Sequence, residues 1–120
     1  MKKILIAEDE SALSRALELK LQNLGFDVKI ATDGEEALAF LQTEVFDLVL
    51  LDLMMPKRDG FGVMSERTSW KSQPVVFINS NLSQKADVDK AKAMGADDFL
   101  VKSDISLKGI VEKINSTLKK

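Results

Sequence analysis

The sequence predicts a right-handed, doubly wound α/β fold in a single domain, and three observations carry this prediction. Its 120 residues suffice for one hydrophobic core but not for two. Short apolar runs alternate along the chain with segments of helical periodicity, as in parallel sheets covered by helices. The content of 45% hydrophobic and 30% charged residues is that of an ordinary globular domain. We therefore expect five strands and five helices in one domain over residues 1–120.

The first half of the chain is expected to supply three strands and two helices. The strands are predicted at the apolar runs 4–7, 27–31 and 48–51. The third run is apolar throughout, which is typical of a central parallel strand covered on both faces. A helix over residues 11–24 carries leucines at helical spacing and ends at Gly25. Asp33 is suited to cap the next helix, which contains Leu38 and Leu41.

The second half is expected to supply two strands, at residues 74–78 and 99–101. Polar and amphipathic patterns predict helices over residues 84–94, before Gly95, and over residues 106–118. The segment after Gly60 begins like a helix at Phe61 but has no clear apolar stripe between Arg67 and Gln73. We therefore expect the third helix to be short or weakly packed.

The composition excludes several classes of chemistry. The chain has no cysteine and no histidine, so it can form no disulfide, thiolate nucleophile, zinc ribbon or phosphohistidine of its own. A hard, oxygen-liganded cation such as Mg²⁺ is the natural metal for such a chain. The net charge of −2 argues against direct nucleic acid binding by this domain. The longest apolar stretch is far shorter than a membrane span, and Met1-Lys2-Lys3 leads straight into a predicted strand rather than into the apolar segment of a signal peptide. Both observations favour a cytoplasmic location without membrane contact.

Charged residues end three of the predicted strands. Glu8 and Asp9 follow the first apolar run, and Asp52 follows the third. Lys102 follows the fifth. If these strands are parallel, three carboxylates and one ammonium group converge at one edge of the sheet. Carboxylates about 5 Å apart repel by roughly 3 kcal/mol per pair at an effective dielectric near 20, so a divalent cation would stabilise the cluster.

Four segments of the chain follow one another in the order and at the spacing of a known family: residues 4–10, 33–38, 47–56 with Asp59-Gly60, and 95–102. Through these segments the chain resembles the receiver domain of bacterial two-component response regulators over essentially its whole length. The resemblance implies a flavodoxin-like, doubly wound five-stranded parallel sheet with strand order 2-1-3-4-5. That order sets the first and third strands side by side at the topological switch point, where ligands bind.

The resemblance also implies a function, that of a phosphorylation-dependent signalling switch. Asp52 would accept a phosphoryl group from a sensor histidine kinase, a phosphotransfer protein or a small acyl phosphate. Glu8, Asp9, Asp52 and the backbone carbonyl of Met54 would hold Mg²⁺, and Lys102 would pair with Asp52 and then with the phosphoryl group. The domain would be no enzyme beyond its own Mg²⁺-dependent phosphorylation and autodephosphorylation.

Phosphorylation would alter the face built from the fourth helix, fifth strand and fifth helix. Phe99 would be the aromatic residue that changes rotamer, although it could equally be a core residue. The recipient of the signal would be a downstream protein or an effector domain outside these residues.

Two positions depart from the family pattern. The family places a Thr or Ser at the end of the fourth strand to bind the phosphoryl group. Counting forward from Pro74 gives Asn79, whereas counting back from Lys102 gives Ser80, so one extra residue is present. We expect a bulge in the strand and favour Ser80 because it carries a hydroxyl. Lys102 is followed by Ser103 where the family usually has proline, so a trans peptide and a differently shaped loop are expected.

Other interpretations of these residues remain open. Asp52 could merely cap a loop, Glu8 and Asp9 could serve only as acids at a helix N-terminus, and Lys102 could be a solvated strand end. The alternative function is a receiver-like interaction module that is never phosphorylated. A flavin- or nucleotide-binding protein is disfavoured because acids occupy the loop after the first strand. A haloacid dehalogenase-type phosphatase is disfavoured because Asp52 lacks a second acid two residues later.

Overall fold

The sheet of this protein has five parallel strands in the order β2-β1-β3-β4-β5. A computed structural model describes residues 1–82 and 84–119. The strands are β1 (Lys3–Ala7), β2 (Asp27–Ala31), β3 (Leu48–Leu51), β4 (Val75–Ser80) and β5 (Asp98–Val101). Both the parallel α/β class and the strand order 2-1-3-4-5 are thereby confirmed.

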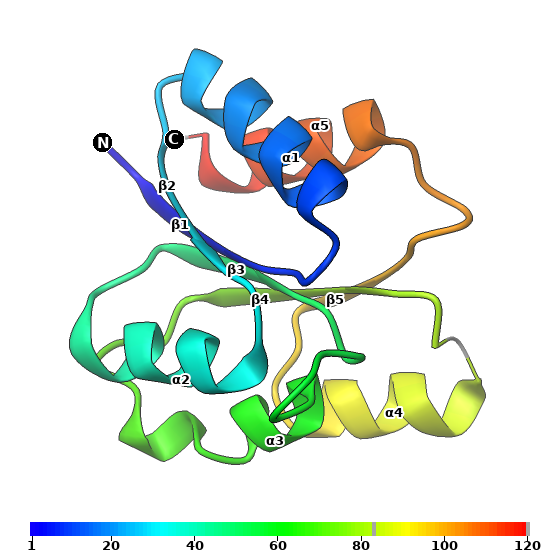
Figure 1. Ribbon diagram of the computed structural model, residues 1–120. Coiled ribbons are helices and arrows are strands. Elements are labelled where there is room, and N and C mark those ends of the chain that lie inside the picture. The colour runs from blue at the N-terminus through cyan, green and yellow to red at the C-terminus, as the bar shows by residue number, and fades with distance from the viewer. Residues whose placement is uncertain (83, 120) are drawn as a thin grey trace.

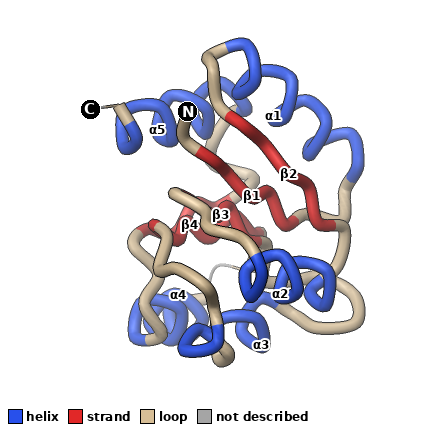
Figure 2. The backbone as a smooth tube through the Cα atoms, turned by 90° about the vertical axis from the view of Figure 1, so that its left-hand side faces the viewer, coloured by secondary structure: helices blue, strands red, loops and turns tan. Residues whose placement is uncertain are grey.

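Helices cover both faces of the sheet. They are α1 (Ser11–Asn23), α2 (Gly34–Thr43), α3 (Gly60–Met64), α4 (Lys85–Ala93) and α5 (Leu107–Leu118), with a short 3₁₀ helix at Arg67–Ser69. Helices α1 and α5 lie on one face, and α2, α3 and α4 lie on the other (Figures 1 and 2). None of the helices in the described part of the chain has the length and hydropathy of a membrane-spanning segment.

The continuous apolar run of β3 follows from this arrangement. Leu48 and Leu50 belong to a buried cluster that includes side chains of α1 and α5. Val49 and Leu51 belong to the cluster on the other face, which includes side chains of α2 and α3. All four are buried because consecutive side chains of a strand point to opposite faces and both faces are covered.

Local signals start and stop the helices as the sequence predicts. The Asp33 carboxylate accepts a hydrogen bond from the Glu36 N–H at 2.8 Å and caps α2. The Ser106 hydroxyl accepts from the Gly109 N–H at 3.0 Å and caps α5. Gly25 has a positive φ of 94°, a conformation that favours glycine where the chain leaves α1. At these three helix ends the predicted boundaries agree with the structure to within one residue.

Helix α3 is short, as expected, and the segment after it has a structural task. The Arg67 guanidinium donates hydrogen bonds from Nη1 to the carbonyl oxygens of Met94, at 3.2 Å, and Gly95, at 3.0 Å. These carbonyls lie at the C-terminal end of α4, where helix carbonyls lack partners and a cation is favourable. A Cβ at Gly95 would lie 1.7 Å from Arg67 Nη1, so only glycine admits this contact. The segment after α3, which lacks an apolar stripe between Arg67 and Gln73, thus holds the C-terminal end of α4 through Arg67.

The expectations for the fourth strand need correction. The strand was predicted to end at residue 78, but β4 continues to Ser80. The expected bulge is wrong, because Val75 to Ile78 pair with β3 and Phe77 to Ser80 pair with β5 without a break in register. The extra residue in the count therefore lies beyond β4, between Ser80 and Gly95.

Candidate functional site

The register of the sheet brings the predicted acids together. Ala7 of β1 pairs with Leu51 of β3, so Glu8 and Asp52 leave neighbouring strands at the same level. The Asp52 N–H donates to the Ala7 carbonyl at 3.0 Å, and this bond extends the ladder past the strand end. On the far side of β4, the Lys102 N–H donates to the Ser80 carbonyl at 3.1 Å. Each charged side chain is therefore carried by backbone that the sheet itself fixes.

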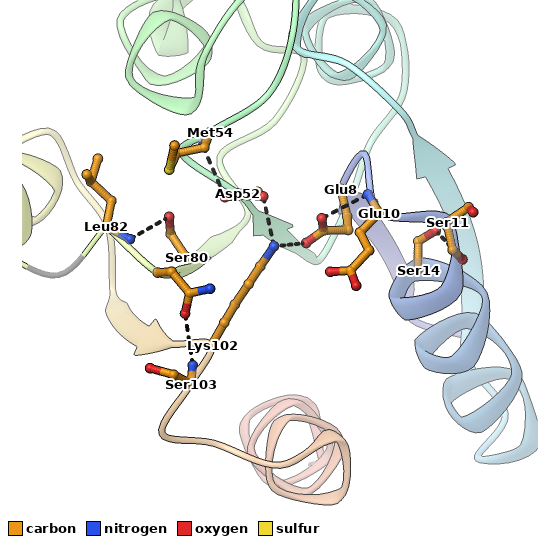
Figure 3. A network of polar contacts seen from close by, with 11 residues as sticks. Glu8, Glu10, Ser11, Ser14, Asp52, Met54, Ser80, Leu82, Lys102 and Ser103 are labelled. Atoms are coloured by element: carbon orange, nitrogen blue, oxygen red, sulfur yellow. Dashed lines mark hydrogen bonds and ion pairs between the residues drawn. The ribbon is translucent and has the colours of Figure 1, made fainter.

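Lys102 forms ion pairs with two buried carboxylates. Its Nζ lies 2.7 Å from Glu8 Oε1 and 2.9 Å from Asp52 Oδ2. Its stem reaches from the end of β5 to a point between the two acids (Figure 3). Glu8 and Asp52 are only 3% and 4% exposed, so water screens these pairs poorly. Sequence reasoning anticipated the pair with Asp52 but missed the one with Glu8.

Burial and pairing act against each other in this cluster. Burial raises the pKa of Glu8, with a further contribution from Asp52, although hydrogen bonds from Lys102 and the Glu10 N–H oppose the rise. Burial disfavours the charged form of Lys102, but its hydrogen bonds to Glu8 and Asp52 outweigh that cost and raise the pKa of Lys102. Lys102 is therefore an ammonium group at neutral pH.

The acidic cluster has the composition of a site for a hard cation. One carboxylate oxygen each from Glu8, Asp9 and Asp52 lie within 4.8 Å of one another. Glu8 Oε2 accepts a hydrogen bond from the Glu10 N–H at 3.0 Å, and Asp52 Oδ1 accepts one from the Met54 N–H at 3.0 Å. Asp9 is exposed, so the cluster opens to solvent on its side. An all-oxygen donor set of this charge suits Mg²⁺.

The structure changes which β4 residue is the better candidate for binding a phosphoryl group. Leu51 pairs with Ile78, so the next residues along the two strands, Asp52 and Asn79, are neighbours. Because side chains alternate along a strand, Asn79 lies on the same face of the sheet as Phe77. Phe77 belongs to the buried cluster that includes side chains of α1 and α5. The Ser80 hydroxyl instead accepts from the Leu82 N–H at 3.2 Å. The expected bulge, which would have re-aimed Ser80, is absent, and Asn79, the alternative candidate, is the neighbour of Asp52.

The Asn79 side chain has a further property that the sequence did not reveal. It is 1% exposed, and neither its Nδ2 nor its Oδ1 has a hydrogen-bond partner among the described residues. A buried polar group without a partner costs about 1–3 kcal/mol. The end of β4 thus holds an amide able to gain bonding if an acceptor arrives beside Asp52.

Phe99 and Ser103 lie on either side of Lys102 along the chain. Phe99 is half-buried against the cluster on the α2, α3 and α4 face. Ser103 follows a trans peptide, as expected, because the described residues include no cis bond. Its N–H donates to Asn81 Oδ1 at 3.0 Å. The missing proline predicted a differently shaped loop, but sequence reasoning missed this contact.

The comparisons with known proteins agree with the fold. Residues 4–115 match the family model described as the response regulator receiver domain. The chain belongs to this family and is a receiver domain of two-component response regulators.

Relatives and solved structures show the same kinship. The probable transcriptional regulator ycf27 of Porphyridium aerugineum is 42% identical over 98% of this chain and 48% of its own length. Transcriptional regulatory protein DltR of Streptococcus agalactiae is 36% identical over 83% of this chain and 45% of its own length. The BeF3-activated DrrB receiver domain is 27% identical with a TM-score of 0.84, covering 100% of this chain and 99% of that one. The receiver domain of the Francisella response regulator 1452 is 28% identical with a TM-score of 0.86, covering 97% and 95%. The chain thus spans about half the length of the curated relatives it matches.

Proposed function

We propose that this receiver domain accepts a phosphoryl group on Asp52 and thereby switches its partner-binding face. The observation that carries the proposal is the Asp52 carboxylate, which is buried at the switch point, 2.9 Å from Lys102 Nζ and clustered with Glu8 and Asp9. A structural salt bridge needs only one acid for one ammonium group. Two further acids beside the pair suit a group that works with a cation and an incoming phosphate.

The proposed step is a direct transfer to the carboxylate. An Asp52 oxygen attacks the phosphorus of a phosphohistidine or acyl phosphate and forms a P–O bond. The bond from phosphorus to the donor nitrogen or oxygen breaks, and its electron pair leaves with the donor. The Lys102 ammonium group, already beside the carboxylate, neutralises charge on a phosphoryl oxygen.

Glu8, Asp9, Asp52 and the Met54 backbone carbonyl are the proposed ligands of Mg²⁺. When bound, the ion supplies positive charge against the carboxylates and the phosphoryl oxygens. The cluster of three carboxylate oxygens within 4.8 Å supports this assignment. A bound Mg²⁺ would also allow this negatively charged site to receive a phosphoryl donor, which is itself an anion.

Asn79 and Phe99 are the proposed residues that respond to the phosphoryl group. The Asn79 amide would gain an acceptor that it lacks among the described residues. The proposed donor is a sensor histidine kinase or a phosphotransfer protein in the cytoplasm, where the kinase uses ATP. The relatives are named as transcriptional regulators and are about twice as long as this chain. We therefore propose that the signal passes to an effector domain or to a downstream protein.

The proposal is tested by incubating the protein with acetyl phosphate and Mg²⁺ and measuring the intact mass. A gain of one phosphoryl group is expected with Mg²⁺ and none with a chelator. Borohydride reduces an aspartyl phosphate to homoserine, so peptide mapping after reduction should locate the change at residue 52. A protein that takes up no phosphoryl group from acetyl phosphate or from a phosphorylated kinase, and does not bind beryllofluoride, would be an unphosphorylated interaction module instead.

Beryllofluoride binding distinguishes Asn79 from Ser80 as the β4 residue that binds the phosphoryl group. Asn79→Ala is expected to weaken beryllofluoride binding by about tenfold, the value of one hydrogen bond to a charged group. Ser80→Ala should change it much less, because the Ser80 hydroxyl bonds to the Leu82 N–H in the turn after β4. The reverse ranking would restore Ser80 as the residue that binds the phosphoryl group.

A further inference from the structure

We propose that Asn81 and Ser103 form a clasp that positions Lys102 for its work at Asp52. The clasp is the hydrogen bond from the Ser103 N–H to Asn81 Oδ1, at 3.0 Å. It joins the segment that follows β4 to the segment that follows β5. This inference rests on the proposed function, because it assigns a role to residues that support Lys102.

The clasp lies one residue beyond the last bond of the β4–β5 ladder. Ser80 pairs with Val101 at the end of the two strands, and the Lys102 N–H then donates to the Ser80 carbonyl at 3.1 Å. The next N–H along, that of Ser103, bonds to the side chain of the next residue along, Asn81. In a continuing strand the Ser103 N–H would point away from β4, because successive N–H groups of a strand point to opposite sides, so the Asn81 amide supplies an acceptor that lies outside the ladder pattern.

Beyond the clasp, the chain turns away from the sheet. The Asp104 N–H donates to the Val101 carbonyl at 2.9 Å and closes a turn around Lys102 and Ser103. The backbone of Lys102 is therefore held by its own N–H, by the next N–H and by this turn. A lysine stem has four flexible carbons, so its reach depends on where the backbone carries it. The clasp thus fixes the position of the Lys102 backbone, from which the ammonium group reaches both Glu8 and Asp52.

The clasp depends on the identity of residue 103 in one respect only. Proline has no N–H and could not donate to Asn81. Because the described hydrogen bond uses the Ser103 backbone, the side chain of Ser103 is not needed for it. Asn81 supplies the acceptor and is needed. The structure thus assigns a positioning role to Asn81 and explains how a trans loop without proline can still hold Lys102.

Four variants of the whole chain test the clasp by their rates of phosphorylation with acetyl phosphate at saturating Mg²⁺. Asn81→Ala and Ser103→Pro are each expected to lower the rate by about fivefold, as loss of one hydrogen bond implies. Ser103→Ala keeps the N–H and should react like the wild type. The double variant Asn81→Ala/Ser103→Pro should be no slower than either single variant, because both changes break the same bond. Mg²⁺ affinity should stay the same in all four.

A second measurement does not depend on phosphorylation. Hydrogen exchange at the Ser103 amide should be about fivefold faster in Asn81→Ala than in the wild type. Acylation of Lys102 by an amine reagent, followed by peptide mapping, should also be faster in that variant. If the wild type takes up no phosphoryl group, the proposed function fails and these two rates alone decide the clasp. Equal exchange in both proteins, additive losses in the double variant, or a loss in Ser103→Ala equal to that in Ser103→Pro would overturn it.

Discussion

Replacing Asp52 with Asn is expected to abolish phosphoryl uptake from acetyl phosphate. The amide nitrogen and oxygen of Asn are far weaker nucleophiles than a carboxylate, while the side chain keeps its size and its ability to accept from the Met54 N–H. Intact mass spectrometry after incubation with Mg²⁺ measures the result. Asp104→Asn is a matched control, because Asp104 is exposed and lies beyond β5. It should take up a phosphoryl group as fast as the wild type.

The same variant should also change how Mg²⁺ stabilises the fold. A ligand that binds only the folded state raises the unfolding free energy, so the wild-type melting temperature should rise with Mg²⁺. Asp52→Asn removes one of the three clustered carboxylates, and the rise should become smaller. Without Mg²⁺, the variant should be about 1 kcal/mol more stable, because Glu8 and Asp9 lose a like-charged neighbour while Lys102 keeps its ion pair with Glu8. Uptake of a phosphoryl group by Asp52→Asn at the wild-type rate would mean that another residue is the acceptor.

The positions of the acids could be predicted from sequence because the carboxyl ends of parallel strands share one edge. The strand at residues 48–51 is buried on both faces, and its apolar run ends where Asp52 begins, so that boundary was unambiguous. Glu8 follows β1 in the same way. Given parallel neighbours, convergence follows without any knowledge of side-chain contacts. This explains why three strand ends sufficed to find the cluster.

Contacts that depend on spatial position could not be predicted in this way. The choice between Asn79 and Ser80 depends on where one extra residue lies, and spacing alone cannot distinguish a bulge from a longer loop. Only the unbroken register of β4 with both neighbours settles that location. The anchoring of α4 by Arg67 joins residues 27 and 28 positions apart. The Asn81 bond to the Ser103 backbone spans 22 positions and leaves no pattern in the sequence beyond a missing proline.

Replacing Lys102 with Met is expected to be the most damaging change outside Asp52. Methionine fills a similar volume but leaves Glu8 and Asp52 buried without their shared cation. Breaking a buried ion pair on one side costs about 3 kcal/mol in unfolding free energy, which urea denaturation with a chelator present would measure. Phosphorylation by acetyl phosphate should slow by about a hundredfold or more, because a positioned charge is lost from the transferring group. Lys108→Met, at an exposed position, should change neither quantity much.

The dependence of this effect on ions and on pH distinguishes lost charge from lost packing. Mg²⁺ should restore part of the stability of Lys102→Met and bind it more tightly than the wild type, because no ammonium group competes for the carboxylates. Since burial raises the pKa of Glu8 and the variant removes an opposing cation, its stability should recover as pH falls and Glu8 takes up a proton. Since pairing raises the pKa of Lys102, the wild-type advantage should persist up to the ordinary lysine pKa and disappear only above the raised value. If the loss of stability were the same at all Mg²⁺ concentrations and pH values, Lys102 would act through the packing of its stem. The electrostatic account of the site would then be wrong.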